Sequence, residues 1–155
     1  MNDNIFQTSD LATKRVEFMD AARDGRARVR DKDGTSYVML PEGQLALLEE
    51  LAQWSQALFR LETLLRRGRP KVTELGDLAW LRCFDQDDLR EFVDDLHVAL
   101  VAANADGDKR VLDDCLSEWR TTARQLADPL RRSVLLGSHN PDDFEEASEP
   151  ADGDD

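Results

Sequence analysis

Residues 27–42 read ARVRDKDGTSYVMLPE, and this stretch decides the fold of the first half of the chain. Asp33-Gly34 is typical of a two-residue hairpin turn, because both residues tolerate positive φ angles. Such a turn places Arg30 opposite Tyr37 and Val29 opposite Val38. Alternation of side chains then predicts an apolar face that packs on a helix and a basic face that points away from it. The basic face collects Arg26, Arg28, Arg30 and Lys32.

A strand and a helix are expected before the hairpin. Ile5-Phe6 predicts a very short strand. Thr8 or Ser9 then supplies a side-chain oxygen that can cap a helix, which should run to about Arg23. Asp24-Gly25 ends that helix. The order strand, helix, hairpin is therefore fixed within the first forty or so residues.

A long helix should follow the hairpin. Proline suits the first position of a helix, so Pro41 marks its start, and apolar residues repeat at helical spacing from Leu45 to Leu65. The apolar surface of this helix is wider than one stripe, so we expect it to make contacts on more than one side. Gly68, with Pro70 beyond it, stops the helix and predicts a boundary within the chain.

The second half reads as helical throughout. We expect one helix over residues 73–84, a second that begins with Asp85 as its cap, and a third that ends at Asp128-Pro129. The fold class is therefore α+β, with a small N-terminal domain followed by a helical hairpin or small bundle and a disordered acidic tail. The predicted divisions are a domain at 1–68, a linker at 69–72, an acidic helical domain at 73–136 and a tail at 137–155.

Charge is divided unevenly along the chain. The formal net charge is −13, but residues 1–71 hold 12 basic and 11 acidic side chains, whereas residues 72–155 hold 8 basic and 22 acidic ones. Such a chain does not coat nucleic acid along its whole length, because phosphate binding needs clustered cations. A local basic patch on the hairpin is still compatible with this distribution.

Composition argues against several functional classes. The longest uncharged apolar run, residues 98–103, is far shorter than the roughly 20 residues of a membrane span, and the N-terminus lacks the features of a secretory signal. We therefore expect a cytoplasmic protein with no membrane partner.

The sequence offers few residues suited to catalysis or metal binding. We expect Cys83 and Cys115 to be small apolar residues that fill space in the core. His97 follows Asp94 at i+3 but has no third ligand or nucleophile at a matching position. We expect neither an enzyme nor a metal or cofactor.

The basic face of the hairpin allows two interpretations. A two-stranded ribbon can present cations on alternate residues to a DNA groove or to its flanking phosphates. Edge strands also carry exposed Lys and Arg simply to block aggregation, and Arg30 beside Tyr37 would then be an ordinary cross-strand pair. The pattern alone leaves both interpretations open.

The order of these elements resembles the Phd/YefM family of antitoxins over roughly residues 4–65. The resemblance is carried by the Ser9-Asp10-Leu11 helix start, the helix end at Arg23-Asp24-Gly25, the basic stretch 27–34, the strand 37–40 and the Pro41-Glu42 helix opening. It implies a homodimer whose N-terminal domain binds the operator DNA of a toxin–antitoxin operon and whose C-terminal part neutralises a toxin. The DNA contacts implied by the family's basic positions are Lys14 or Arg15, together with Arg28, Arg30 and Lys32; the alternation of the hairpin adds Arg26.

The preferred hypothesis is therefore an antitoxin-like transcription repressor whose acidic helical half binds a basic toxin, one that acts on RNA or on the translation machinery. The alternative is a stand-alone dimeric interaction module without a toxin partner. For contact with the partner protein we select Trp80, Phe84, Phe92 and Trp119, although Trp119 also suits a place in the core.

Overall fold

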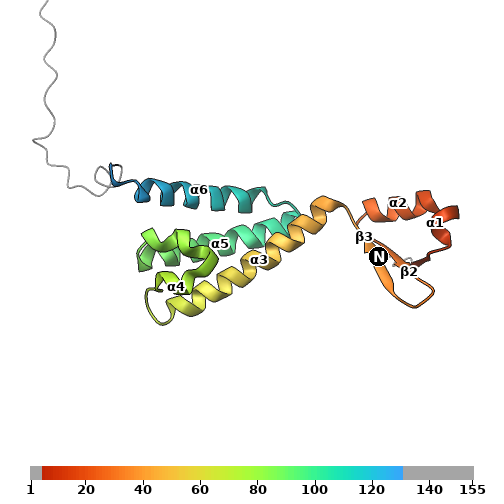
Figure 1. Ribbon diagram of the computed structural model, residues 1–155. Helices are drawn as coiled ribbons and strands as arrows, with labels where there is room; N and C mark the ends of the chain where they lie inside the picture. Colours follow the sequence, from red (N-terminus) through yellow and green to blue (C-terminus); the bar gives the residue numbers. More distant parts are fainter. Residues whose placement is uncertain (1–4, 131–155) are drawn as a thin grey trace, which may run out of the picture.

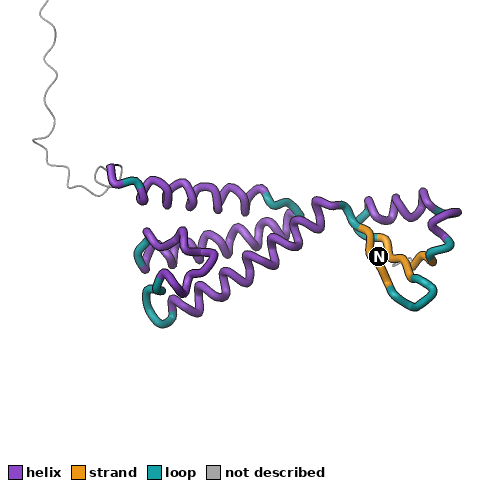
Figure 2. The backbone as a smooth tube through the Cα atoms, viewed as in Figure 1, coloured by secondary structure: helices purple, strands orange, loops and turns teal. Residues whose placement is uncertain are grey.

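The computed structural model describes residues 5–130, which form a small sheet unit and a larger helical unit joined end to end (Figure 1). The sheet unit precedes a long helix, and everything after that helix is helical or loop (Figure 2). The predicted α+β class is confirmed. The elements of the sheet unit are β1 (Ile5–Gln7), α1 (Asp10–Thr13), α2 (Arg15–Arg23), β2 (Ala27–Arg30) and β3 (Ser36–Met39).

The three strands form one sheet in the order β1-β2-β3, with β1 parallel and β3 antiparallel to the central strand. Helix α2 packs on one face of this sheet. Phe18 and Ala22 of α2 lie in one hydrophobic cluster with Phe6 of β1 and Val29 of β2. The Phe6 and Phe18 rings meet edge to face, with their centroids 5.3 Å apart. The helix therefore covers the first two strands.

The single helix expected before the hairpin is divided into α1 and α2. The break falls at Lys14, whose φ of −115° and ψ of 31° are not helical. The predicted cap is also wrong, because Ser9 makes no side-chain bond to the helix start. Asp10 instead accepts a hydrogen bond from the Gln7 backbone N–H at 2.8 Å, and this bond lowers the pKa of the Asp10 carboxyl. The Thr8 hydroxyl donates to Asp31, 3.4 Å away.

The hairpin forms where it was predicted, but its register differs by one residue. Val29 pairs with Tyr37, and Arg28 pairs with Val38. The loop is longer than two residues, because the Gly34 N–H bonds to the Asp31 carbonyl and the Asp33 carboxylate accepts the Thr35 N–H at 2.8 Å. Gly34 takes a φ of +88°, which glycine adopts without strain. The shift moves Val38 to the face of Arg28 and Tyr37 to the face of Val29.

Helix α3 (Glu42–Leu65) begins directly after Pro41, as predicted, and ends before Gly68. The later elements are α4 (Val72–Leu75), a 3-10 segment η1 (Gly76–Cys83), α5 (Gln86–Asp106) and α6 (Arg110–Ala127). The continuous helix expected over 73–84 is wrong. Gly76 has a φ of +57°, which ends the single α-helical turn of α4, and the chain goes on as the tighter 3-10 coil of η1.

Helix α5 has the predicted start. The Asp85 carboxylate accepts hydrogen bonds from the backbone N–H groups of Asp87 and Asp88, at 2.8 and 2.9 Å. Gly107 ends the helix in the left-handed conformation. Lys109, at the start of α6, bonds Glu50 of α3 at 2.7 Å, so the C-terminal end of α5 lies beside the first half of α3. Helices α3 and α5 are therefore antiparallel neighbours.

Two separate hydrophobic clusters divide the described chain. One belongs to the sheet unit, and the other joins α3, α4, η1, α5 and α6. Because α3 belongs to the same cluster as α5 and α6, the two clusters separate between Val29 and Leu47. The predicted domain at 1–68 and linker at 69–72 stay predictions. The predicted tail at 137–155 and the end of the predicted domain 73–136 lie outside the described residues. Within residues 5–130, no helix is long and apolar enough to cross a bilayer.

Candidate nucleic-acid and partner interfaces

The face of the sheet opposite α2 carries two of the predicted DNA-binding residues. Strand pairing aligns Ile5, Arg28 and Val38 in one row across this face. The next row holds Gln7, Arg30 and Ser36. Arg30 is exposed and Arg28 half-buried, while Arg26 and Lys32, just outside β2, are also exposed. The sheet thus brings the arginines of β2 to one face, alternating with small polar and apolar neighbours.

The other two predicted DNA contacts lie elsewhere. Lys14 and Arg15 belong to the junction of α1 and α2, in the helical layer on the opposite side of the sheet. The Lys14 ammonium already lies 3.5 Å from the Asp10 carboxylate. The structure therefore does not gather the six predicted residues into one face. It separates a hairpin group from a helix-start group.

Strand β3 and the start of α3 expose an apolar surface that alternation does not predict. All four residues of β3 are exposed. Tyr37, Val38 and Met39 are more than a third accessible, and Leu45 and Leu48 in the first turns of α3 are equally open. We call Tyr37, Met39, Leu45 and Leu48 the β3–α3 apolar surface, because Val38 lies on the other face of the sheet, beside Arg28; Figure 1 shows β3 leading directly into α3. The sequence interpretation places Val38 in the core only because it assumes the shorter turn.

The structure corrects two of the four predicted partner contacts. Phe92 is fully buried and Phe84 is 2% exposed, so neither can touch another protein while the helical unit is folded. Both rings meet Trp119 edge to face, with centroids 5.4 and 5.1 Å away, and Phe92 also meets Trp80. Trp80 and Trp119 are half-buried. These aromatic side chains hold η1, α5 and α6 together.

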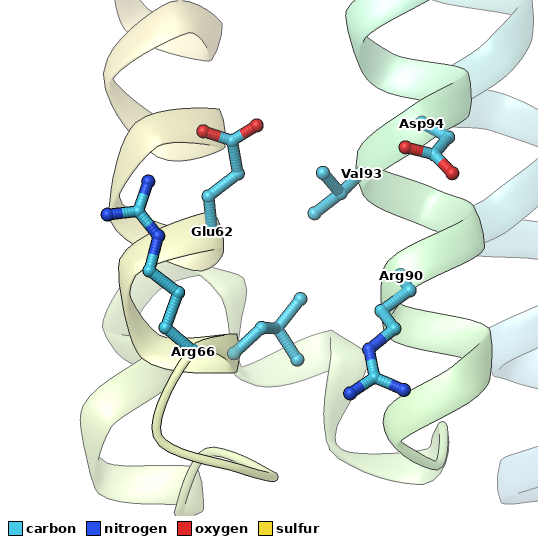
Figure 3. Close-up of a pocket in the computed structure, with 6 residues that line it drawn as sticks. Glu62, Arg66, Arg90, Val93 and Asp94 are labelled. Atoms are coloured by element: carbon cyan, nitrogen blue, oxygen red, sulfur yellow. The ribbon is translucent and has the colours of Figure 1, made fainter.

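A hollow of about 360 Å³ lies between α3 and α5 (Figure 3). Glu62 comes from α3 and Arg66 directly follows the last residue of that helix, while Arg90, Val93 and Asp94 come from α5 (Figure 3). Arg90 is engaged by Asp87 at 2.9 Å. The walls come from helices separated by more than twenty residues in sequence, so no local motif could have revealed this hollow.

Groups suited to catalysis are few in the part of the chain that the structure describes. No cluster of three metal-ligating side chains occurs within residues 5–130. Burial, together with Asp95 and Glu118, raises the pKa of the Cys115 thiol to about 11, so it stays protonated at neutral pH. Its half-buried position suits packing and not nucleophilic chemistry.

Comparison with known proteins adds no relative. A scan against protein-family models and searches of curated proteins and of solved structures found no match to this chain. We therefore infer the function from the basic outer face of the sheet, from the β3–α3 apolar surface and from the resemblance of residues 4–65 to the Phd/YefM antitoxins.

Proposed function

We propose that this protein is an antitoxin-like, dimeric transcription repressor that acts in the cytoplasm. In this proposal, the outer face of the sheet binds operator DNA through Arg28 and Arg30, with Arg26 and Lys32 at its margin. The acidic helical unit binds and neutralises a basic toxin that acts on RNA or on the translation machinery. The observation that carries the proposal is the combination of a basic sheet face with an incomplete core in the same unit.

The incomplete core supports a homodimer. The sheet unit spans residues 5–40, and only five of its side chains form a buried hydrophobic cluster. Domains shorter than roughly 40 residues usually need a disulfide, a metal or a second chain to fold. The β3–α3 apolar surface lies directly beside this small cluster in sequence. A second copy that covers this surface would bury two strand residues and two leucines, and it would place two basic hairpins on one assembly.

The charge distribution supports a basic protein partner. Residues 72–155 carry a formal net charge of −14. An acidic surface of this kind accelerates encounter with a basic protein, and it can mimic the phosphates of an RNA substrate. This half of the proposal is tested by co-expression with the product of the adjacent gene. Failure to recover a complex that includes residues 72–155 would remove the antitoxin function.

The repressor half is tested by gel mobility shift on DNA upstream of the gene. We expect the Arg28→Ala/Arg30→Ala variant to bind more weakly and to lower the salt slope by about 2, because each lost phosphate contact contributes about 0.9. The control is Arg67→Ala/Arg110→Ala, which removes two exposed arginines of the helical unit. An intact protein that gives no shift at low salt would exclude the repressor function.

One observation favours the alternative, a dimeric interaction module that binds no DNA. Ile5 and Val38 are exposed on both sides of Arg28, so the outer face of the sheet is partly apolar. DNA-binding surfaces are more polar and more strongly basic than protein-binding surfaces. Under this alternative the face would contact protein, and the mobility-shift experiment separates the two functions.

A further inference from the structure

A cluster of cations follows α3, at the end of the helical unit farther from the sheet. It consists of Arg66, Arg67, Arg69 and Lys71, which fall within six residues that include no acidic side chain. All four residues are exposed. We call them the basic turn. Their charge contrasts with the rest of this half of the chain, because residues 72–155 hold 22 acidic and only 8 basic side chains.

The folded helical unit does not neutralise the basic turn. Among residues 5–130, no acidic side chain lies within ion-pair distance of these cations, not even Glu62, which precedes the turn by one helical turn. The next two carboxylates along the chain already have other partners. Glu74 accepts the backbone N–H of Lys71 at 2.8 Å, and Asp77 pairs with an arginine of α3. The basic turn therefore offers uncompensated positive charge to an anionic ligand.

The basic turn lies beside the end of α6. The Arg69 guanidinium donates hydrogen bonds to the backbone carbonyls of Arg82 and Phe84, at 3.2 and 2.9 Å. These carbonyls are neutral, so they position Arg69 and leave its charge in place. The Cys83 thiol, between those two residues, lies 3.9 Å from the backbone carbonyl of Ala123, about one turn before α6 ends. The chain therefore leaves α6 at the end of the helical unit that carries the basic turn (Figure 1).

The chain that follows α6 carries the opposite charge. Residues 141–155 hold eight acidic and no basic side chains. Pro141 follows Leu130, the last described residue, by eleven positions, a length of chain that spans at most about 40 Å. The basic hairpin lies beyond the other end of α3, whose 24 residues measure about 36 Å. The basic turn is therefore the nearer cationic surface for residues 141–155.

We propose that the basic turn binds residues 141–155 of the same chain, with carboxylates of that segment beside Arg66, Arg67 and Lys71. The covalent connection holds the segment at a higher local concentration than a separate anion reaches. A separate polyanion, such as a nucleic acid, also meets the repulsion of a protein whose formal net charge is −13. This inference does not rest on the proposed function. Its consequence is that a basic partner of residues 141–155 has to displace the turn.

Carbodiimide cross-linking of the full-length chain tests the contact, because the reagent joins a lysine amine to a carboxylate beside it. Lys71 belongs to the basic turn, and Lys32 belongs to the hairpin. We expect mass spectrometry to find peptide pairs that join Lys71 to residues 141–155. Their yield should fall between about 0.1 M and about 1 M salt, because the Debye length shortens from about 10 Å to about 3 Å. An equal mixture of unlabelled and 15N-labelled protein distinguishes contacts within one chain from contacts between copies.

Variants locate the contact on the basic turn. Arg66→Gln/Arg67→Gln should lower the yield of the Lys71 cross-link roughly fourfold, because each exposed ion pair contributes a factor of about two. The reacting amine of Lys71 is unchanged in this variant. The matched control is Arg23→Gln/Arg110→Gln, which removes the same charge from exposed positions on α2 and α6 and should give the normal yield. Circular dichroism checks that each variant keeps its helices.

Four results would overturn the contact. The first is a Lys71 cross-link that does not form at low salt or that forms equally well in Arg66→Gln/Arg67→Gln. The second is a segment that cross-links mainly to Lys32, which would assign it to the hairpin. The third is a Lys71 cross-link made of mixed-isotope pairs, which would assign the turn to the segment of a second copy. The fourth is heparin binding that needs the two arginines in a protein without the cross-link, which would assign the turn to an external polyanion.

Discussion

The sheet unit and the helical unit differ most in how completely each buries its own apolar side chains. The helical unit encloses nineteen buried hydrophobic residues from α3 to α6. The sheet unit encloses five and leaves every residue of β3 exposed. The helical unit has a core adequate for independent folding. The sheet unit carries the basic face of β2 and leaves its third strand exposed. The contrast motivates our proposal that a second copy completes the sheet unit, the same unit that we propose binds DNA.

The largest expected effect is on the helical core. Phe92→Ala should lower the free energy of unfolding by about 3–5 kcal/mol, because Phe92 is fully buried against Trp80 and Trp119. All three tryptophans belong to the helical unit, so their fluorescence during urea unfolding reports on it alone. The comparison variant is Phe18→Ala in the sheet unit. If the two units fold independently, this second variant leaves the tryptophan transition unchanged.

A second prediction concerns the Cys115 thiol, which burial keeps protonated. Its pKa rises from 9.0 to about 11, so at pH 8 the thiolate fraction falls about a hundredfold. In a Cys83→Ser background, iodoacetamide should react about a hundredfold more slowly with the folded chain than with the urea-unfolded chain. The rate should rise with pH until about pH 11. Equal rates in the two states would show that the packing of α6 against the rest of the helical unit does not cover this thiol.

The smallest expected effect is at the end of the helical unit nearer the sheet, where α6 begins beside α3 (Figure 1). Lys109→Ala removes the bonds to Glu50 and Asp113 and should change the unfolding free energy little, because all three side chains are partly exposed. These bonds raise the pKa of Lys109, so their contribution is complete below its ordinary value of 10.5 and is lost as the pH rises above it. Urea unfolding monitored by tryptophan fluorescence at pH 7 and above pH 10.5 measures both effects. Arg110→Ala is the control, since Arg110 pairs within its own turn with Asp108.

Most of the helices could be predicted from the sequence. Apolar spacing located α3, α5 and α6, and Asp85 and Pro41 marked two of their starts. The hairpin register could not be predicted, because Asp33-Gly34 suits a two-residue loop and a longer one equally well. The bonds of Asp31, Asp33 and Thr35 select the longer loop. That single residue of shift transfers Val38 from the predicted core to the outer face.

The candidate surfaces were harder to predict than the elements. Periodicity shows that an aromatic residue lies on an apolar face, but it does not show whether another helix covers that face. Phe92 is enclosed by Trp80 and Trp119, whereas Phe59 has no such cover and is exposed. The hollow between α3 and α5 depends on the alignment of two helices distant in sequence, which only the tertiary structure supplies.

The central claim is that the sheet unit is completed by a second copy while the helical unit folds alone. Hydrogen exchange followed by mass spectrometry over a dilution series tests this claim directly. We expect the amides of β2 and β3 to lose protection as the protein is diluted below its dimer dissociation constant, while the amides of α5 stay protected. Protection of β2 and β3 that does not change with concentration, in a protein whose mass stays that of a monomer, would contradict the account.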